Sequence, residues 1–259
     1  MAHHAERISA QKGYDMLETC LHPGQIFDQF ACGNCNQLAF IAARQVAEGS
    51  ITAYPLFIYG ANGLGKSHLL NAIGHQALSR NQSTRIIYCS AEKFRHTFIN
   101  CLRSNQVHEF SEYFGSADIL LMDEMRRLAH KERSQQEFLC LYDLFASRLV
   151  PIVLACNQPP ANLIGFSDEL LSRLSGGLVV ELSAPDYETK RAIIEKLAVR
   201  HGITLGDDVS YFIANIQTKC VRELEGIVIR LSTYSALQNA AVTLPMAKHY
   251  LRDIIKADV

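Results

Sequence analysis

Long apolar runs are absent from this 259-residue sequence. No stretch approaches the roughly 18 consecutive apolar residues that a membrane-spanning helix needs, and residues 1–7 lack the basic start and apolar run of a secretory signal. The chain also has no excess of either charge, since it contains 25 Lys and Arg and 26 Asp and Glu. This balance argues against a broad electrostatic footprint for nucleic acid, so any DNA contact must be local. We therefore expect a soluble, cytoplasmic protein without a membrane span.

Paired cysteines are scarce among the eight cysteines of the chain. The one C-x-x-C pattern is Cys32-Gly33-Asn34-Cys35, and no second pair completes a zinc site. Two interpretations are open, a redox pair or reduced cytosolic thiols, and we favour the second.

From Pro55 onward, short apolar runs alternate with longer segments of helical spacing. The runs are mostly aliphatic, as in strands that are buried on both faces of a parallel sheet. They are Leu56–Tyr59, Arg85–Cys89, Ile119–Met122, Ile152–Ala155 and Leu178–Val180. The alternation predicts a doubly wound α/β sandwich.

After Ala184 the strand-like runs cease and the remaining pattern is helical. Asp186 is a plausible N-cap of the first of these helices, and Pro245 stands where a last helix would begin. We therefore divide the chain into an N-terminal tail (1–21), an α/β nucleotide-binding core (22–184) and a helical lid (185–259).

The strongest motif is a phosphate-binding loop between the first predicted strand and a helical stretch. Its glycines let backbone N–H groups turn toward phosphates, and the helix N-terminus adds its dipole. Lys66 would reach the β- and γ-phosphates, and the Ser67 hydroxyl would ligate magnesium. The candidate binding residues here are Gly60, Asn62, Gly63, Leu64, Gly65, Lys66, Ser67 and His68.

Two carboxylates end the third predicted strand, beside the loop in a sheet of this kind. Asp123 would hold the magnesium ion through water, and Glu124 would polarise the attacking water. Asn157 ends the next strand, where an amide can position that water. Asparagine is also a common turn residue after a strand, so its signal is weak by itself.

The order of these motifs resembles the AAA+ ATPases. Four stretches are similar to the ATPase domain of the DnaA family of bacterial replication initiators: residues 55–74, 131–138, 172–174 and 221–226. The resemblance extends from about residue 22 to the end. It implies an AAA+ αβα sandwich with a helical lid, ATP or ADP with Mg²⁺ as cofactors, and weak ATP hydrolysis.

The resemblance also implies roles for two arginines and one insertion. Arg173 matches the arginine finger that touches the ATP of a neighbouring subunit, either a second copy or a DnaA-type AAA+ partner. Arg222 matches the lid arginine that senses the γ-phosphate within its own subunit. Residues 91–114 match the pair of helices that lines single-stranded DNA. Outside this context, both arginines would be interpreted as surface pairs.

The sequence departs from the family pattern at several positions. Asp123-Glu124 stand where initiators usually have two Asp, and Glu169 stands where the arginine-finger helix usually carries a basic residue. Arg126 and Arg127 replace a polar-aromatic pair, which makes residues 126–133 the most basic segment. That segment is open to two interpretations, a DNA contact or a solvated surface.

Three functions remain open at this level. The first is an initiator ATPase domain that assembles with ATP and binds single-stranded DNA; initiators continue into a helix-turn-helix domain, whereas this sequence ends at Val259. The second is a stand-alone regulator of initiator ATP hydrolysis that resembles Hda, whose clamp-binding peptide we do not recognise in residues 1–20. The third is a helicase-loading adaptor with ATP as a switch. The intact loop and the insertion favour the initiator.

Overall fold

The computed structural model describes residues 20–50 and 55–256. The predicted tail lies almost entirely outside these residues. Among the described residues, no helix is both long and apolar enough to cross a membrane.

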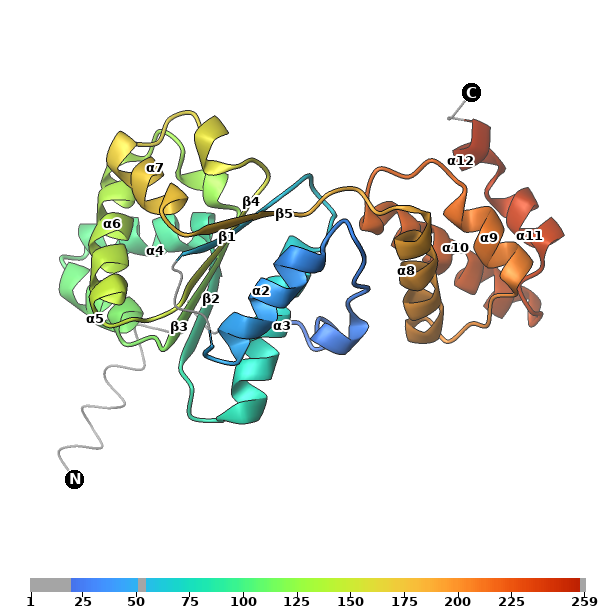
Figure 1. Cartoon of the computed structure of the whole chain (residues 1–259), viewed down its shortest axis with the longest axis horizontal. Helices are drawn as coiled ribbons and strands as arrows, with labels where there is room; N and C mark the ends of the chain where they lie inside the picture. Colours follow the sequence, from blue (N-terminus) through green and yellow to red (C-terminus); the bar gives the residue numbers. More distant parts are fainter. Residues whose placement is uncertain (1–19, 51–54, 257–259) are drawn as a thin grey trace.

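A parallel sheet forms the centre of the larger part of the molecule (Figure 1). Within the described residues it has five strands in the spatial order β2-β3-β4-β1-β5. They are β1 (Leu56–Tyr59), β2 (Ile86–Ser90), β3 (Ile119–Asp123), β4 (Ile152–Cys156) and β5 (Leu178–Glu181). Each predicted apolar run is therefore a strand, and the predicted α/β fold is confirmed.

Helices cover both faces of this sheet, which explains why its strands are apolar throughout. On one face lie α2 (Gln37–Ala47) and α3 (Lys66–Arg80). The other face is covered by α4 (Ala91–Arg103), α5 (Val107–Gly115), α6 (Glu132–Ser147) and α7 (Asp168–Ser175). Neighbouring side chains of a strand point to opposite faces: Phe57 is buried with the second group of helices, and Ile58 with the first.

Within the described part of the chain, short 3-10 helices lie in the loops around the sheet: η2 (Phe27–Gln29), η3 (Met125–Leu128) and η4 (Pro160–Asn162). Of these, η3 follows directly on the carboxyl end of β3 and packs against α4. It therefore belongs to the edge of the sheet where the predicted carboxylates lie.

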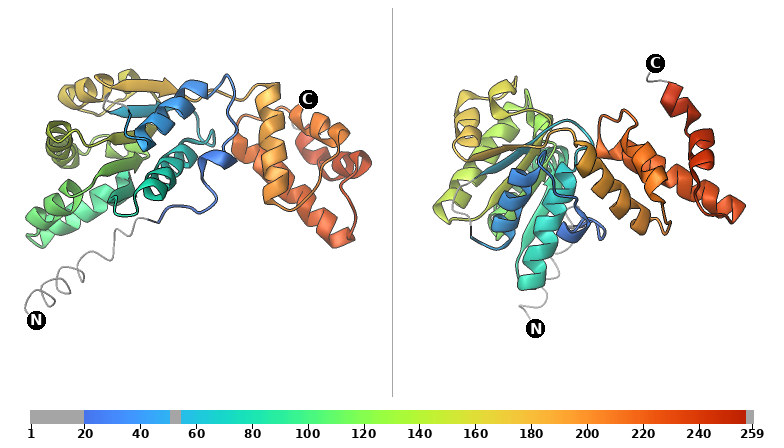
Figure 2. Two further views of the ribbon diagram at one scale, coloured as in Figure 1. Left: turned by 60° about the horizontal axis from the view of Figure 1, so that its bottom comes forward. Right: turned by 45° about the vertical axis from the view of Figure 1, so that its right-hand side comes forward.

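The C-terminal helices gather at one end of the molecule, around a hydrophobic cluster of their own (Figures 1 and 2). They are α8 (Tyr187–Arg200), α9 (Asp207–Ala214), α10 (Val221–Gln238), α11 (Leu244–Tyr250) and α12 (Arg252–Lys256). One isolated β-bridge joins Leu205 to Val242. Asp186 caps α8 by accepting a 2.8 Å hydrogen bond from the Thr189 amide, as predicted.

The helix at Pro245 is α11, and it is not the last one, because the short α12 follows it. The proposed division of the chain at residues 184 and 185 falls between β5 and α8.

Candidate nucleotide site

The phosphate-binding loop runs from the end of β1 to the start of α3, and three of its glycines have positive φ angles. Gly60, Gly63 and Gly65 have φ values of 152°, 80° and 101°. A Cβ atom on Gly60 would lie 2.3 Å from the carbonyl oxygen of Leu182. The loop thus needs glycine both for its backbone conformation and for its close approach to the chain beyond β5.

Lys66 is the buried cation of this loop. Its Nζ donates hydrogen bonds to the carbonyl oxygens of Gly60 at 2.7 Å and Ala61 at 2.8 Å. Burial lowers the pKa of Lys66, while the negative charge of Asp123 opposes this shift. An ammonium group in this position is short of water and gains from an anionic partner.

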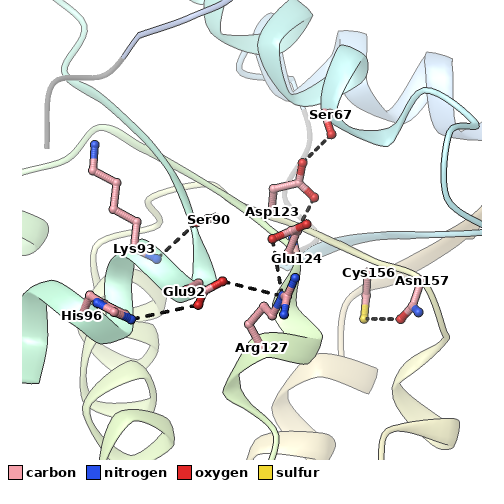
Figure 3. Close-up of polar contacts among 10 residues, drawn as sticks. All are labelled: Ser67, Ser90, Glu92, Lys93, His96, Asp123, Glu124, Arg127, Cys156 and Asn157. Atoms are coloured by element: carbon pink, nitrogen blue, oxygen red, sulfur yellow. Dashed lines mark hydrogen bonds and ion pairs between the residues drawn. The ribbon is translucent and has the colours of Figure 1, made fainter. Parts of the chain in front are cut away.

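Ser67 and Asp123 meet where α3 begins and β3 ends (Figure 3). Ser67 Oγ donates a 2.5 Å hydrogen bond to Asp123 Oδ2, and Asp123 Oδ1 accepts one from the Glu124 amide at 2.7 Å. Asp123 is buried, whereas Ser67 is exposed to the cavity. Two hard oxygen donors are brought together here, as magnesium requires.

Glu124 has an unusual backbone for a non-glycine residue, with φ 55° and ψ 41°. This left-handed conformation costs about 1 kcal/mol and is found preferentially at functional sites. The carboxylate is exposed, and its Oε2 lies 3.7 Å from Arg127 Nε. Asn157 directly follows β4, the strand next to β3, and its Oδ1 lies 3.7 Å from Cys156 Sγ (Figure 3).

The helical lid is docked onto the loop through its longest helix. The amides of Val221 and Arg222, at the start of α10, donate hydrogen bonds to the Gly63 carbonyl at 3.0 and 3.3 Å. A Cβ atom on Gly63 would lie 2.8 Å from Cys220 Sγ. This contact holds the exposed side chain of Arg222 at the rim of the site.

A cavity of about 900 Å³ joins these groups between the sheet and the lid. Most of the predicted site residues line it: Asn62, Gly63, Leu64, Gly65, Lys66, Ser67, His68, Asp123, Glu124, Asn157 and Arg222. Gly60 supports the loop behind this lining, and Arg173 lies outside the cavity.

His68 faces the entry segment of the core. One ring nitrogen lies 2.9 Å from the Ile26 carbonyl oxygen, and the ring meets Phe30 edge-on. Burial lowers the pKa of His68. His68 was predicted to bind the nucleotide. In the structure it also has a structural role, because it holds the segment that forms one wall of the cavity.

The sequence motifs do not predict the residues of that wall, nor those of the part of the lid opposite it. The missed lining residues include Gln25, Gln29, Phe30, Ala31, Asn36, Ile193, Lys196, Leu197, Arg200 and Glu225. The Asn36 side chain donates to the Ala31 carbonyl and accepts from the Gly33 amide, which shapes the turn. Asn36, three residues after Gly33, was the available signal in the sequence, but it belongs to no motif.

The C-x-x-C pair lies in the same entry segment. Burial raises the pKa of both thiols, Cys32 and Cys35. Cys35 Sγ is 3.9 Å from Thr189 Oγ1 on α8. A raised pKa reduces the thiolate fraction at neutral pH, and this agrees with the interpretation of the pair as reduced thiols.

Arg173 lies on α7, on the opposite face of the sheet from α3. Its Nε donates a 3.1 Å hydrogen bond to Asp143 Oδ1 on α6, and this contact raises its pKa. With 42% of its side chain exposed, Arg173 faces solvent rather than the cavity of its own chain.

A parallel sheet of this strand order, a phosphate-binding loop after β1 and a helical lid over the loop define the AAA+ class of P-loop folds. RuvB of Thermotoga maritima, at 18% identity and a TM-score of 0.63, covers 88% of the chain and shares this fold. The model of the family described as the bacterial DnaA ATPase domain matches residues 21–181. The chain belongs to this family, which confirms the resemblance seen in the sequence.

Curated relatives and solved structures agree. The replication initiator DnaA of Geobacter sulfurreducens is 44% identical over 92% of the chain and 54% of its own length. DnaA of Geobacter metallireducens is 42% identical over 92% of the chain and 53% of its length. The chain thus spans about half the length of these relatives.

Domain III of DnaA from Thermotoga maritima superposes with a TM-score of 0.87 at 33% identity, and covers 92% of the chain and 100% of its own. A DnaA bound to AMPPCP and single-stranded DNA superposes with a TM-score of 0.76 at 34% identity, over 85% of this chain and 68% of its own.

Proposed function

We propose that this chain is the ATP-binding domain of a cytoplasmic, DnaA-like replication initiator that assembles when ATP is bound and contacts single-stranded DNA. The observation that carries the proposal is the single cavity that is lined by Lys66, by the Asp123-Glu124 pair and by Arg222. The DnaA structure with AMPPCP and single-stranded DNA supports both proposed ligands.

In the proposed complex, the amides of the loop and Lys66 bind the β- and γ-phosphates. Ser67 would ligate magnesium and Asp123 would hold it through water, and the hydrogen bond between the two side chains brings both oxygens to the loop. When bound, the ion would neutralise charge on the phosphates. Arg222 contacts the γ-phosphate from the lid, so the docking of α10 depends on which nucleotide is present.

Hydrolysis would use the groups at the ends of β3 and β4. Water attacks the γ-phosphorus, the bond to the β,γ-bridging oxygen breaks, and ADP departs with that electron pair. Glu124 accepts a proton from the water, and Asn157 orients the water. Arg173 stabilises the charge on the phosphate of a neighbouring subunit. Arg173 lies outside the cavity of its own chain, so we propose a weak ATPase that needs the Arg173 of its neighbour.

A second hollow supports the DNA contact. It has a volume of about 270 Å³ and lies between α4 and the start of α6. We call it the basic groove; it is lined by Arg95, Ile99, His130, Lys131, Glu132, Arg133 and Ser134. Arg95, Lys131 and Arg133 are cations that suit a phosphate backbone. Ile99 offers an apolar contact to a base or sugar. Residues 130–133 of the basic segment 126–133 thereby gain a local role that the neutral net charge permits, whereas Arg126 and Arg127 line the nucleotide cavity.

Light scattering with ATP or ADP, with and without a single-stranded oligonucleotide, tests the proposal. We expect particles to grow with ATP and to grow further with DNA. Replacing Lys131 and Arg133 by Ala should remove the DNA effect but keep the ATP effect. Arg44→Ala, on the exposed side of α2, is the matched control. A particle unchanged by nucleotide and DNA would contradict the initiator role and favour the Hda-like regulator or the helicase-loading adaptor.

A further inference from the structure

Arg127 stands between two carboxylates that belong to different elements (Figure 3). Its Nε lies 3.7 Å from Glu124 Oε2, at the end of β3, and 3.8 Å from Glu92 Oε2, in the first turn of α4. The strand register pairs Ser90, the N-cap of α4, with Asp123. The start of α4 and the carboxylate pair are therefore fixed side by side by the sheet.

Both contacts are ion pairs without hydrogen-bond geometry, since each exceeds the usual 2.7–3.2 Å. The side chains of Arg127, Glu124 and Glu92 are 59%, 54% and 49% exposed. Exposed pairs of this kind are weak and exchange readily. The guanidinium of Arg127 is thus shared by two carboxylates that lie at similar distances from it and are similarly exposed.

We propose that Arg127 is a positioning residue that restrains Glu124, and that Glu92 competes with Glu124 for it. This inference rests on the proposed role of Glu124 toward water. A carboxylate oxygen held against a guanidinium is less available to accept a proton from water. When Arg127 turns to Glu92, Glu124 is free to face the cavity.

The competition predicts opposite effects at two positions. Arg127→Ala removes the restraint and should raise kcat for ATP hydrolysis about two- to fivefold, as expected from an exposed ion pair. Glu92→Gln leaves Arg127 entirely to Glu124 and should lower kcat by a similar factor. KM for ATP should change in neither variant. Because Glu92 acts only through Arg127, the double variant should match Arg127→Ala.

The experiment measures steady-state ATP hydrolysis by the full chain at one fixed protein concentration, with saturating Mg-ATP. His96→Ala is the matched control, because His96 Nε2 lies 4.0 Å from the other oxygen of Glu92, and no ion pair within residues 20–50 and 55–256 joins His96 to Arg127 or Glu124. Arg127→Gln serves as a second variant, and thermal melts verify that each protein is folded.

Glu124→Gln separates the two proposals. If it abolishes turnover but keeps ATP binding, while Arg127→Ala and Glu92→Gln shift kcat in the same direction or leave it unchanged, the competition is wrong and the site assignment stands. A higher KM with a lower kcat for Arg127→Ala would instead make Arg127 a phosphate ligand and overturn the inference. Full turnover in Glu124→Gln would contradict the proposed role of Glu124 toward water, on which the inference rests.

Discussion

Arg173 Nε and Asp143 Oδ1 lie 3.1 Å apart, so the predicted arginine finger is engaged within its own chain, between α7 and α6. The pair is exposed and therefore weak, and an anionic phosphate from a neighbour can compete with it.

Arg173→Ala should keep ATP binding and lose ATP-dependent assembly or hydrolysis, because the cavity of the same chain lacks this side chain. Asp143→Asn should favour assembly, since it frees the guanidinium. Hydrolysis measured against protein concentration tests both. Equal activity at all concentrations, in wild type and in Arg173→Ala, would contradict the role in a neighbouring site.

Lys66→Ala should weaken ATP binding by about 10- to 100-fold, the contribution of charge-assisted hydrogen bonds. The free energy of unfolding without nucleotide should change little, because burial already lowers the pKa of Lys66 and its charged form is poorly solvated. Titration calorimetry measures the affinity. Lys248→Ala, an exposed lysine of the lid, is the control. Undiminished affinity in Lys66→Ala would overturn the site assignment.

Gly49→Ala and Gly60→Ala compare a strained glycine in open space with a strained glycine that also lies close to the chain beyond β5. Gly49 has φ 70° with open space around its Cβ position, so its variant should lose about 1 kcal/mol of stability. Gly60→Ala combines the φ angle of 152°, which side chains adopt at a higher cost, with the overlap with the Leu182 carbonyl, and should lose about 1–3 kcal/mol more. Urea unfolding without nucleotide measures both. Equal losses would show that the close approach beyond β5 has no energetic consequence.

Asp186→Ala should cost about 1 kcal/mol of stability at pH 7, because it removes the cap of α8. Asp186→Asn should cost little, since Asn is an equally good cap.

The pH dependence distinguishes the wild type from Asp186→Asn. Hydrogen bonds from Thr189 lower the pKa of Asp186, so its contribution is complete above the unfolded pKa of about 3.9. It is lost as the pH falls through the lower folded value. Urea midpoints should therefore differ by a constant amount from pH 7 to about 4, and wild type should lose stability relative to Asp186→Asn below that. A constant difference down to pH 2 would contradict the capping charge.

Much of the site could be predicted from the sequence, because it is built from contiguous motifs at the carboxyl ends of strands. Gly60 to Ser67 carry their own backbone requirements, and Asp123 follows an apolar run that is recognisable as a buried strand. Parallel strands bring such ends to one edge of a sheet, so Ser67 and Asp123 meet without any long-range information beyond strand order.

The tertiary structure decided what lies opposite those motifs. Three features join segments that are far apart in the chain or belong to different elements. They are the wall formed by Phe30 and Asn36, the docking of Val221 on Gly63, and the sharing of Arg127 between Glu92 and Glu124. The α/β pattern and the phosphate loop are determined by the sequence, because they follow from local conformational preference and periodic burial. Which side chains face one another across the cavity depends on packing between elements, and no local pattern encodes that.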